Sequence, residues 1–173
     1  PPGPRVAVLG ADGEPLARGE VGEVVIAGPV VMAGYLGRPE ETARTVVDGW
    51  LRTGDLGRFD DDGYLQIVDR IKDMIIRGGE NIYPKEIETV LYQHPDVLEA
   101  AVVGQPDEIL GEVPTAFVSR RPGATADEAE LLEHCRGILS KFKLPVRITL
   151  IDELPKNPVG KINKPSLRAG LRP

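Results

Sequence analysis

The sequence predicts an α+β fold in which a small β-rich segment, residues 1–68, precedes a compact α+β domain, residues 74–173. Short strand-like runs, separated by turns that contain Gly, Pro and Asp, fill the first segment. Apolar strands alternate with amphipathic helical patterns in the second. Between the two lies Asp69–Asp73, a stretch of mixed charge that suits a solvated joint better than a buried strand. We therefore predict a hinge at residues 69–73.

The N-terminal segment is expected to contain closely spaced strands. The clearest runs are Arg5–Gly10, Gly22–Ala27, Leu56–Phe59 and Tyr64–Val68. Asp60–Gly63 ends in an Asp-Gly pair, which predicts a hairpin turn between the last two runs. Pro39–Arg44 fits a helical turn, because proline stands at its first position and acidic residues follow. The strand spacing suggests a portion of a small barrel, and about 60 residues are too few to close a stable core alone.

The C-terminal domain is expected to follow the order β-α-β-β-α-β-α. Its predicted strands are Met74–Arg77, Val97–Gly104, Val113–Ser119 and Val146–Ile151, and its predicted helices are Pro84–Gln93, Asp127–Lys141 and Pro165–Leu171. The residues at helical spacing on the expected buried faces are Ile87, Val90, Leu91, Leu131, Leu132, Cys135, Ile138 and Leu139. Gly78–Asn81 and Gln105–Asp107 are expected to be loops. This arrangement is typical of an α+β domain.

Composition excludes several classes of function. The net charge of −6 gives no general attraction to nucleic acid. No apolar run approaches the roughly 20 residues of a membrane span. Cys135 is the only cysteine, so no internal disulfide can form, and a cytoplasmic location with Cys135 half-buried is expected. His94 and His134 each lack a second metal-type ligand at a suitable spacing, so both are expected to be structural and no metal site is predicted.

Two polar features near the predicted hinge are candidate binding groups. Asp55 stands between two glycines at the end of a predicted strand, and one carboxylate can accept hydrogen bonds from the two vicinal hydroxyls of a ribose. A plain turn aspartate has the same local sequence. Arg70 and Lys72 supply two cations that would stabilise the negative charge of a ribose phosphate. Without more context, a solvated charged linker explains these two residues better.

Two glycine-containing stretches in the C-terminal domain are further candidates. Gly78 and Gly79 would let a ligand pass close to the backbone, although a simple turn also needs glycine and no phosphate-loop pattern surrounds them. Lys161 follows Gly160 in a loop and could reach a phosphate, although exposed loop lysines are common. Each signal is weak when it is considered alone.

The order and spacing of these features resemble those of the adenylate-forming superfamily, which includes acyl-CoA synthetases, the adenylation domains of peptide synthetases and firefly luciferase. The stretches that carry the resemblance are Gly22–Val24, Gly34–Tyr35, Gly49–Leu56, Asp69–Asp73, Gly78–Pro84, Glu86–Glu88, Leu154–Lys156 and Gly160–Ile162. They span nearly the whole chain, and Glu80–Pro84 with Glu86–Glu88 is most similar to fatty-acyl-CoA ligases. The chain begins without Met, which indicates a C-terminal fragment of a longer protein.

The resemblance implies a role for each candidate residue near the nucleotide. Asp55 would bind the ribose hydroxyls of ATP or of the adenylate, and Ile67 would lie near the adenine. Arg70 would contact the ribose and phosphate region. Lys72 matches the family's hinge position, between the β-barrel portion of a large N-terminal domain (residues 1–68 here) and a small C-terminal domain (residues 74–173).

The resemblance also implies a role for each candidate in the C-terminal domain. Gly78 and Gly79 would line the path of the CoA pantetheine once the small domain has rotated for thioester formation. Lys161 would enter the site for adenylation and would be the catalytic residue, because its charge would meet the carboxylate and the α-phosphate.

The implied function is that of an ATP-dependent acyl-CoA ligase, which activates a carboxylic acid, here a fatty acid, as an acyl-adenylate and transfers it to CoA. The phosphate loop, the acyl pocket and the ligands of Mg²⁺ would lie in the remainder of the large N-terminal domain, so the fragment alone is expected to be inactive. One alternative is a peptide-synthetase adenylation domain or an acyl-AMP ligase that loads a carrier protein. An alternative from a different class is a non-catalytic nucleotide-binding or regulatory module.

Overall fold

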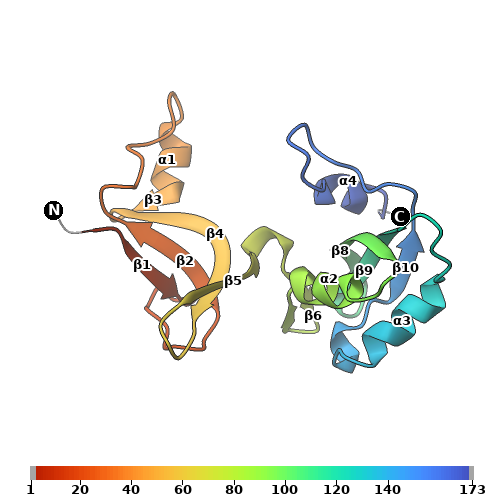
Figure 1. The fold of residues 1–173 in the computed structure, drawn as a ribbon. Helices are drawn as coiled ribbons and strands as arrows, with labels where there is room; N and C mark the ends of the chain where they lie inside the picture. The colour runs from red at the N-terminus through yellow and green to blue at the C-terminus, as the bar shows by residue number, and fades with distance from the viewer. Residues whose placement is uncertain (1–2, 172–173) are drawn as a thin grey trace. The chain divides into compact units, whose positions relative to one another are not determined.

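The structure, a computed structural model, describes residues 3–171, which fall into two compact units. The first unit ends at Lys72 and the second begins at Asp73. Each unit has its own five-stranded sheet in the described part of the chain, and helices accompany both sheets (Figure 1). The predicted α+β class is confirmed.

The first unit is a curled antiparallel sheet with one short helix. Its elements are β1 (Arg5–Leu9), β2 (Gly22–Ala27), α1 (Pro39–Thr45), β3 (Val46–Val47), β4 (Trp50–Phe59) and β5 (Leu65–Arg70). The strands lie in the order β1-β2-β4-β3, and β5 also pairs with β4. Figure 1 shows β4 as a long, strongly curved strand. Because three other strands pair with it, β4 sets the position of most backbone groups in this unit.

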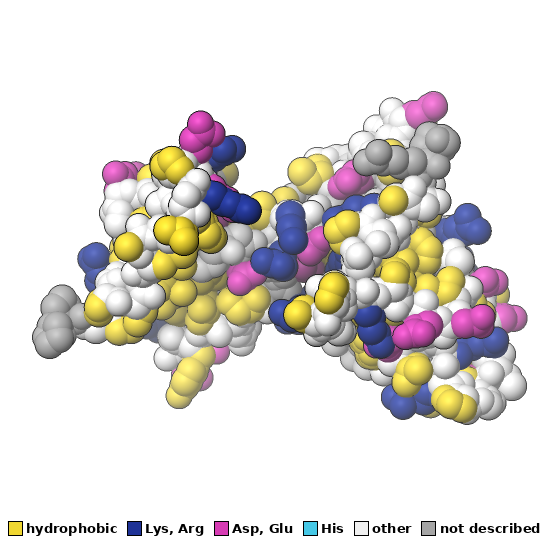
Figure 2. All heavy atoms as spheres, turned by 90° about the horizontal axis from the view of Figure 1, so that it is seen from above, with side chains coloured by type: hydrophobic (Ala, Val, Ile, Leu, Met, Phe, Trp, Pro, Cys, Tyr) yellow, Lys and Arg dark blue, Asp and Glu magenta, His cyan; other side chains and the backbone are white. Residues whose placement is uncertain are grey.

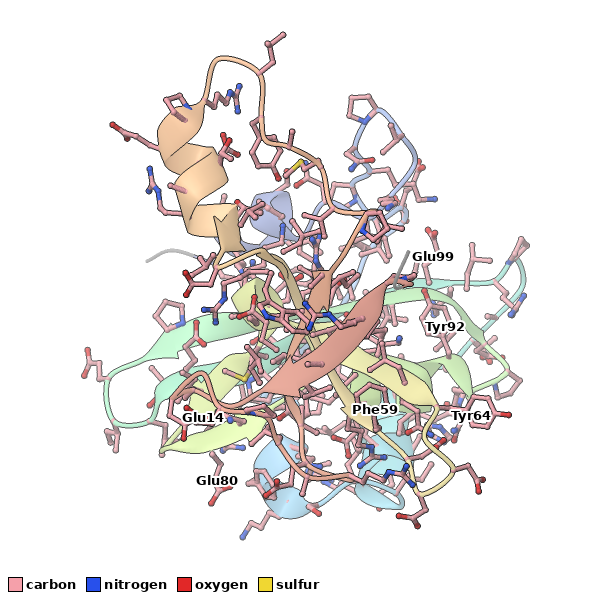
Figure 3. The ribbon with its side chains drawn as sticks, turned by 90° about the vertical axis from the view of Figure 1, so that its left-hand side faces the viewer. Glu14, Phe59, Tyr64, Glu80, Tyr92 and Glu99 are labelled. Atoms are coloured by element: carbon pink, nitrogen blue, oxygen red, sulfur yellow. The ribbon has the colours of Figure 1, made fainter. Side chains whose placement is uncertain are left out.

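The predicted hairpin between β4 and β5 is present, and its sequence explains its geometry. Gly63 has a φ of +87°, a conformation that glycine adopts without strain. Asp60 closes the turn, because its Oδ1 accepts a hydrogen bond of 2.8 Å from the backbone N–H of Tyr64. The Tyr64 side chain lies at the outer end of this hairpin and is exposed (Figure 3).

The predicted end of the last strand, Val68, is wrong, because β5 continues to Arg70. Asp69 and Arg70 pair with Leu56 and Asp55 of β4. Their backbone N–H and C=O groups need hydrogen-bond partners, and the neighbouring strand supplies them regardless of the charged side chains. The expectation of a solvated joint holds for Arg70, Ile71 and Lys72, which are exposed, but not for the two aspartates. Asp69 is 7% exposed and Asp73 is 8% exposed. Ile71 and Lys72, the first two residues of the 3₁₀ turn Ile71–Asp73, separate β5 from the second unit.

The second unit is a sheet with helices on both faces. Its elements are β6 (Ile75–Arg77), β7 (Glu80–Ile82), α2 (Pro84–Tyr92), β8 (Val97–Asp107), β9 (Gly111–Arg120), α3 (Glu128–Arg136), the 3₁₀ turn Lys141–Lys143, β10 (Arg147–Leu150) and α4 (Lys164–Ala169). The strands lie in the order β10-β9-β6-β7, with β8 also on β9. Among the strand pairs that residues 3–171 form in this sheet, only β9–β10 is parallel.

Alternation along β8 shows why its central part, Ala100–Val103, is apolar at every position. Ala100 and Val102 face the core beneath α2 and α3, whereas Ala101 and Val103 face a second core beneath the C-terminal segment. Successive side chains of a strand point to opposite faces, so a sheet that is covered on both faces needs apolar residues at every position. Figure 1 shows α3 and α4 on opposite faces of this sheet.

Three local predictions for the second unit are wrong. Gly78–Asn81 is not a loop, because Glu80–Ile82 forms β7 and pairs with β6. Gln105–Asp107 belongs to the end of β8, which pairs with β9 as far as Gly111. The helix that begins after Asp127 ends at Arg136, because Gly137 follows and favours termination. As a result Ile138 is 54% exposed and does not join the core.

The surface carries both signs of charge. On the face seen in Figure 2, Lys and Arg side chains are interspersed with Asp and Glu side chains on both units. Such a mixed surface fits the net charge of −6 and offers no basic stripe for a nucleic-acid backbone in this view. In residues 3–171, no helix has the length and apolar character that are needed to cross a membrane.

Candidate functional site

The predicted nucleotide-binding residues Asp55 and Arg70 lie directly opposite each other on β4 and β5. The Arg70 Nε atom is 3.2 Å from the Asp55 Oδ1 atom. The Arg70 side chain is 54% exposed and that of Asp55 is 39% exposed. A carboxylate and a guanidinium are therefore held side by side on an accessible surface of the first unit, where each can contact a further ligand.

A bulge in β4 determines the position of Asp55. Arg52 lies opposite Val25 and Leu56 lies opposite Glu23, so three residues of β4 face one residue of β2. Gly54 occupies this bulge with a φ of +72°. A bulge bends the strand and re-aims its side chains, and bulges are over-represented beside active sites. The Thr-Gly-Asp sequence thus takes Asp55 out of the β2–β4 pairing, while Asp55 still pairs with Arg70 of β5.

Side chains on both strands stabilise the bulge. The Thr53 hydroxyl donates to the Val24 carbonyl at 2.6 Å and accepts from the Asp55 N–H at 3.1 Å. The Glu23 carboxylate accepts from the Arg52 Nε at 2.8 Å and from the Gly54 N–H at 3.3 Å. Glu23 is only 11% exposed, so removal of Arg52 would leave a poorly solvated carboxylate without its charged partner.

Sequence reasoning did not give Glu23 this supporting role. The sequence signal that could have indicated this role is a charged residue, Glu23, inside the otherwise apolar run Gly22–Ala27. Its partners lie 29 and 31 residues further along the chain, so their identity required the strand register.

Ile67 and Lys72 complete the predicted residues of the first unit. Ile67 lies on β5 opposite Gly57 and is 44% exposed, so it presents an apolar surface on the strand that carries Arg70. A Cβ atom on Gly57 would lie 2.7 Å from the Val24 side chain and 2.9 Å from the Gln66 carbonyl, so no side chain fits there. Lys72 is the last residue of the unit and lies in the 3₁₀ turn.

Gly78 and Gly79 form the two-residue turn of the β6–β7 hairpin. Their φ angles are +58° and +89°, and Arg77 pairs with Glu80 across the turn. Two consecutive left-handed residues in a two-residue hairpin define a type I′ turn, which favours glycine. The local sequence is thus explained by backbone geometry alone.

A pocket of about 490 Å³ adjoins this turn and is lined by Arg77, Gly78, Leu110, Lys141 and Phe142. The Arg77 Nη1 atom donates a hydrogen bond of 2.5 Å to the Phe142 carbonyl, which holds the 3₁₀ turn against β6. The pocket combines an aromatic ring, apolar side chains and two cations. These groups suit a ligand that has both an aromatic and an anionic part.

Lys161 lies in a tight turn in the segment between β10 and α4. Asn157 Oδ1 accepts from the N–H groups of Val159 and Lys161 at 3.1 and 2.9 Å. Gly160 follows with a φ of +79°, and Lys156 pairs with Ile162 across the turn. Proline, asparagine and a left-handed glycine are the residues that such a turn requires. The Lys161 side chain is consequently exposed beside a rigid turn.

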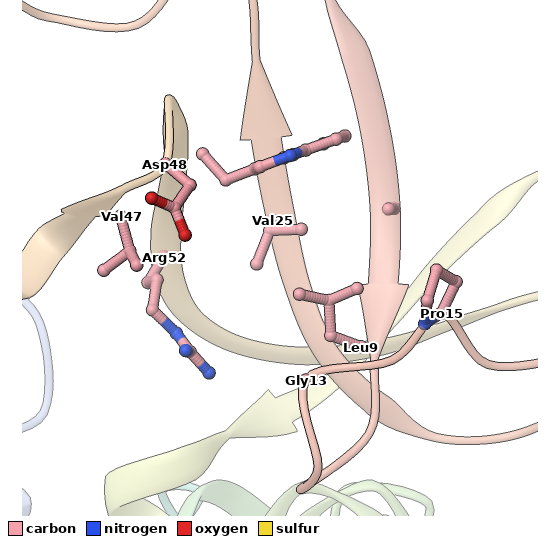
Figure 4. A pocket seen from close by; sticks show the side chains of 9 residues that line it. Leu9, Gly13, Pro15, Val25, Val47, Asp48 and Arg52 are labelled. Atoms are coloured by element: carbon pink, nitrogen blue, oxygen red, sulfur yellow. The ribbon is translucent and has the colours of Figure 1, made fainter.

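Figure 4 shows a pocket of about 390 Å³ in the first unit that none of the predicted site residues lines. Leu9 and Val25 form its apolar wall, and Asp48 and Arg52 lie at its edge. It lies over β1, β2 and β4.

Cys135 is more deeply buried than the sequence suggested, and the two histidines contact each other. Cys135 is fully buried, and burial raises the pKa of its thiol to about 11, so it is a protonated core side chain. The rings of His94 and His134 meet edge to face with their centroids 5.2 Å apart. Among residues 3–171, no group of three or more His, Cys, Asp or Glu side chains could hold a metal ion.

Comparison with known proteins identifies the class to which this fold and site belong. Residues 86–161 match the AMP-binding enzyme C-terminal domain. Over 157 residues, or 91% of this chain and 32% of the relative, the chain is 50% identical to 2-succinylbenzoate–CoA ligase of Geobacillus kaustophilus. Over 167 residues, or 96% of this chain and 32% of the relative, it is 50% identical to the fatty acid–[acyl-carrier-protein] ligase ScoC of Streptomyces coeruleorubidus.

Solved structures agree with this match. ATP-bound MatB from Rhodopseudomonas palustris is 43% identical with a TM-score of 0.91, over 98% of this chain and 34% of that one. The apo structure of MatB is 44% identical with a TM-score of 0.72 over the same shares, 98% and 34%. The chain therefore belongs to the adenylate-forming superfamily of AMP-binding enzymes. Within it, the chain corresponds to the C-terminal part of acyl-CoA ligases and their relatives, and it spans about one third of the length of the curated relatives that it matches.

Proposed function

We propose that the chain is the C-terminal part of an AMP-forming acid–thiol ligase, which activates a carboxylic acid with ATP and transfers the acyl group to CoA. The observation that carries the proposal is the Asp55–Arg70 pair, with a distance of 3.2 Å, on neighbouring strands. Asp55 would accept hydrogen bonds from the two ribose hydroxyls, and Arg70 would meet the phosphate. Ile67, exposed on the same strand as Arg70, would contact the adenine.

In the first half-reaction, an oxygen of the substrate carboxylate attacks the α-phosphorus of ATP, and pyrophosphate leaves. Lys161 would act here, because its ammonium group would stabilise the negative charge that moves onto the departing pyrophosphate. The rigid Asn157–Lys161 turn supports this role, since it fixes the backbone from which the side chain extends. Mg²⁺ would neutralise phosphate charge when bound, held by residues outside this chain.

In the second half-reaction, the CoA thiol attacks the acyl carbonyl, and AMP leaves. The pocket beside Gly78 is our candidate for the CoA nucleotide, because Phe142 offers a ring for stacking, and Arg77 and Lys141 offer cations for its phosphates. Gly79 has no heavy atom within 4 Å of the position of a Cβ, so the turn leaves open space for the pantetheine arm. Gly78 and Gly79 would line that path.

We further propose a hinge at Lys72 between the two units. Arg70 is tied to Asp55 in the first unit, whereas Asp73 is tied to Arg168 of α4 in the second by an ion pair of 2.8 Å. Ile71 and Lys72 are the residues between these two attachments.

The proposed acid is a fatty acid, and the fatty acid–[acyl-carrier-protein] ligase ScoC, at 50% identity, supports this choice. The 2-succinylbenzoate ligase is equally similar, at 50% identity. Because relatives named for different acids match this chain equally well, we propose that the pocket for the acid lies outside the chain. A carrier protein in place of CoA is the alternative acceptor, which the same ScoC relative favours. A buried, protonated thiol at Cys135 supports a cytoplasmic location.

An exchange chimera tests the proposal. This chain replaces the segment that it matches in the G. kaustophilus 2-succinylbenzoate–CoA ligase, and both ATP–pyrophosphate exchange and thioester formation are measured with 2-succinylbenzoate. We expect the chimera to be active, Asp55→Ala to raise the KM for ATP, and Lys161→Ala to slow adenylation by roughly 100-fold or more.

Arg136→Ala is the matched control, because Arg136 pairs only with the exposed Glu133 on α3. It removes a cation from the same unit and should leave both activities unchanged. A folded chimera without adenylation activity, or one in which Lys161→Ala behaves as Arg136→Ala does, would refute the proposed function. In the full-length protein that contains this chain, a panel of fatty and aromatic acids with CoA or carrier protein identifies the substrate and acceptor.

A further inference from the structure

Two ion pairs bracket the turn that carries Lys161. Before the turn, the Lys156 Nζ atom lies 3.0 Å from Glu99 Oε1 of β8, and this hydrogen bond raises the pKa of Lys156. After the turn, the Lys164 Nζ atom lies 2.8 Å from Glu88 Oε1 of α2. Figure 3 labels Glu99 on the sheet. The segment is therefore attached on both sides of the turn to elements that do not move with it.

The Glu88–Lys164 pair is the better enclosed of the two. The two side chains are 16% and 17% exposed, compared with 25% and 36% for Glu99 and Lys156. Glu88 also accepts a hydrogen bond of 2.8 Å from the Val102 N–H, on the edge of β8 that faces away from β9. One carboxylate oxygen thus joins α2, β8 and the start of α4.

The connection from Lys164 to Lys161 is short and stiff. Ile162 packs against the core that contains Leu154 and Leu167. The Asn163 N–H donates to the Pro155 carbonyl at 2.7 Å, which closes the base of the turn. Because Lys164 directly follows these contacts, release of its ion pair would loosen the segment 161–163 and so the position of Lys161.

We propose that Glu88 and Lys164 are positioning residues for adenylation, because their ion pair fixes the register from which Lys161 reaches the reacting phosphate. The inference rests on the proposed function of Lys161. In this proposal neither residue contacts the substrate. Their effect passes entirely through the placement of one cation, and a misplacement of about 1 Å can slow a reaction by about 100-fold.

The test uses the full-length protein that contains this chain, with single-turnover rates for adenylation and for thioester formation from supplied acyl-adenylate. We expect Lys164→Met to slow adenylation by roughly 10-fold or more, and to leave the KM for ATP and the thioester step nearly unchanged. Lys164→Arg should restore most of the rate, because it keeps the ion pair. Glu88→Gln, which retains an acceptor for the Val102 N–H, should resemble Lys164→Met.

A double variant distinguishes positioning from general support of the fold. In the Lys161→Ala background, Lys164→Met should cause no further loss, since the group that it positions is absent. If Lys164→Met lost the same factor in both backgrounds, or slowed both half-reactions equally, the inference would be overturned. If Lys161→Ala slows adenylation and Lys164→Met does not, the positioning role alone fails. If Lys161→Ala has no effect, the proposed function of Lys161 fails as well.

Discussion

Substitution of Gly54 tests whether the left-handed backbone of the β4 bulge is needed to position Asp55. Gly54 has a φ of +72°, and no heavy atom lies within 4 Å of the position that a Cβ would take. Steric clash therefore adds nothing, and the cost of a side chain is the left-handed backbone, about 1–2 kcal/mol for an ordinary L-residue. Replacement of glycine by alanine also restricts the unfolded chain, which returns about 0.4–1 kcal/mol.

The net expectation for Gly54→Ala is about 1 kcal/mol of lost stability in the first unit. Gly54→Asn should cost only a few tenths of a kcal/mol, because asparagine tolerates this conformation (roughly several-fold more often than other residues). Gly3→Ala is the matched control, because Gly3 has open space and no positive φ. The comparison of alanine with asparagine separates backbone strain from the mere addition of a side chain.

Urea unfolding followed by tryptophan fluorescence is the assay. Trp50 is the only tryptophan of the chain and lies on β4, so its signal reports the first unit even if the two units unfold separately. With a slope of about 1 kcal/mol per molar urea, the midpoint of Gly54→Ala should fall by about 1 M. In the full-length protein the same variant should raise the KM for ATP more than Gly54→Asn does. Equal midpoints for the alanine and asparagine variants would refute the strain argument.

The other predictions concern the chain alone, the second half-reaction and alkaline pH. Purified residues 1–173 should show no ATP–pyrophosphate exchange with any acid, and measurable exchange would contradict the proposed location of the phosphate loop and acyl pocket. Gly79→Leu should slow thioester formation and spare adenylation, because its side chain would fill the proposed path of the pantetheine. Stopped-flow rates of each step are the measurement, and slower adenylation with an unchanged thioester step would contradict the assignment. The pKa of Cys135 in the folded protein, about 11, exceeds its ordinary value of 9.0. The protonated thiol therefore contributes fully to the free energy of unfolding below pH 9, and this contribution is lost as the pH rises towards 11. Urea midpoints measured across this pH range should fall for the unchanged chain and should not show this fall for Cys135→Val.

The sequence was sufficient for the elements whose signals are local. The β4–β5 hairpin follows from the Asp-Gly turn, and α2 follows from Pro84 and the spacing of Ile87, Val90 and Leu91, all of which are buried. It was insufficient where tertiary pairing decided the outcome. β5 extends through Asp69 and Arg70 because β4 lies beside it, and β7 exists because Gly78 and Gly79 reverse the chain rather than end a strand.

The same distinction explains which residues of the candidate site were predictable. Gly54, Gly79 and Gly160 each have a positive φ beside, or at, a proposed functional position. Only glycine takes these conformations without strain, so the backbone geometry is written into the local sequence and the motif can be read without a structure. The supporting carboxylates carry no such mark. Glu23 contacts a bulge whose residues lie 29 or more positions further along the chain, and Glu88 pairs with Lys164, close to the C-terminal end of its unit in sequence. A strand or helix glutamate therefore gains its role here only through packing. The proposed catalytic geometry thus depends on glutamates that differ from surface glutamates in their low exposure and their partners, and variants of these residues test the proposal most directly.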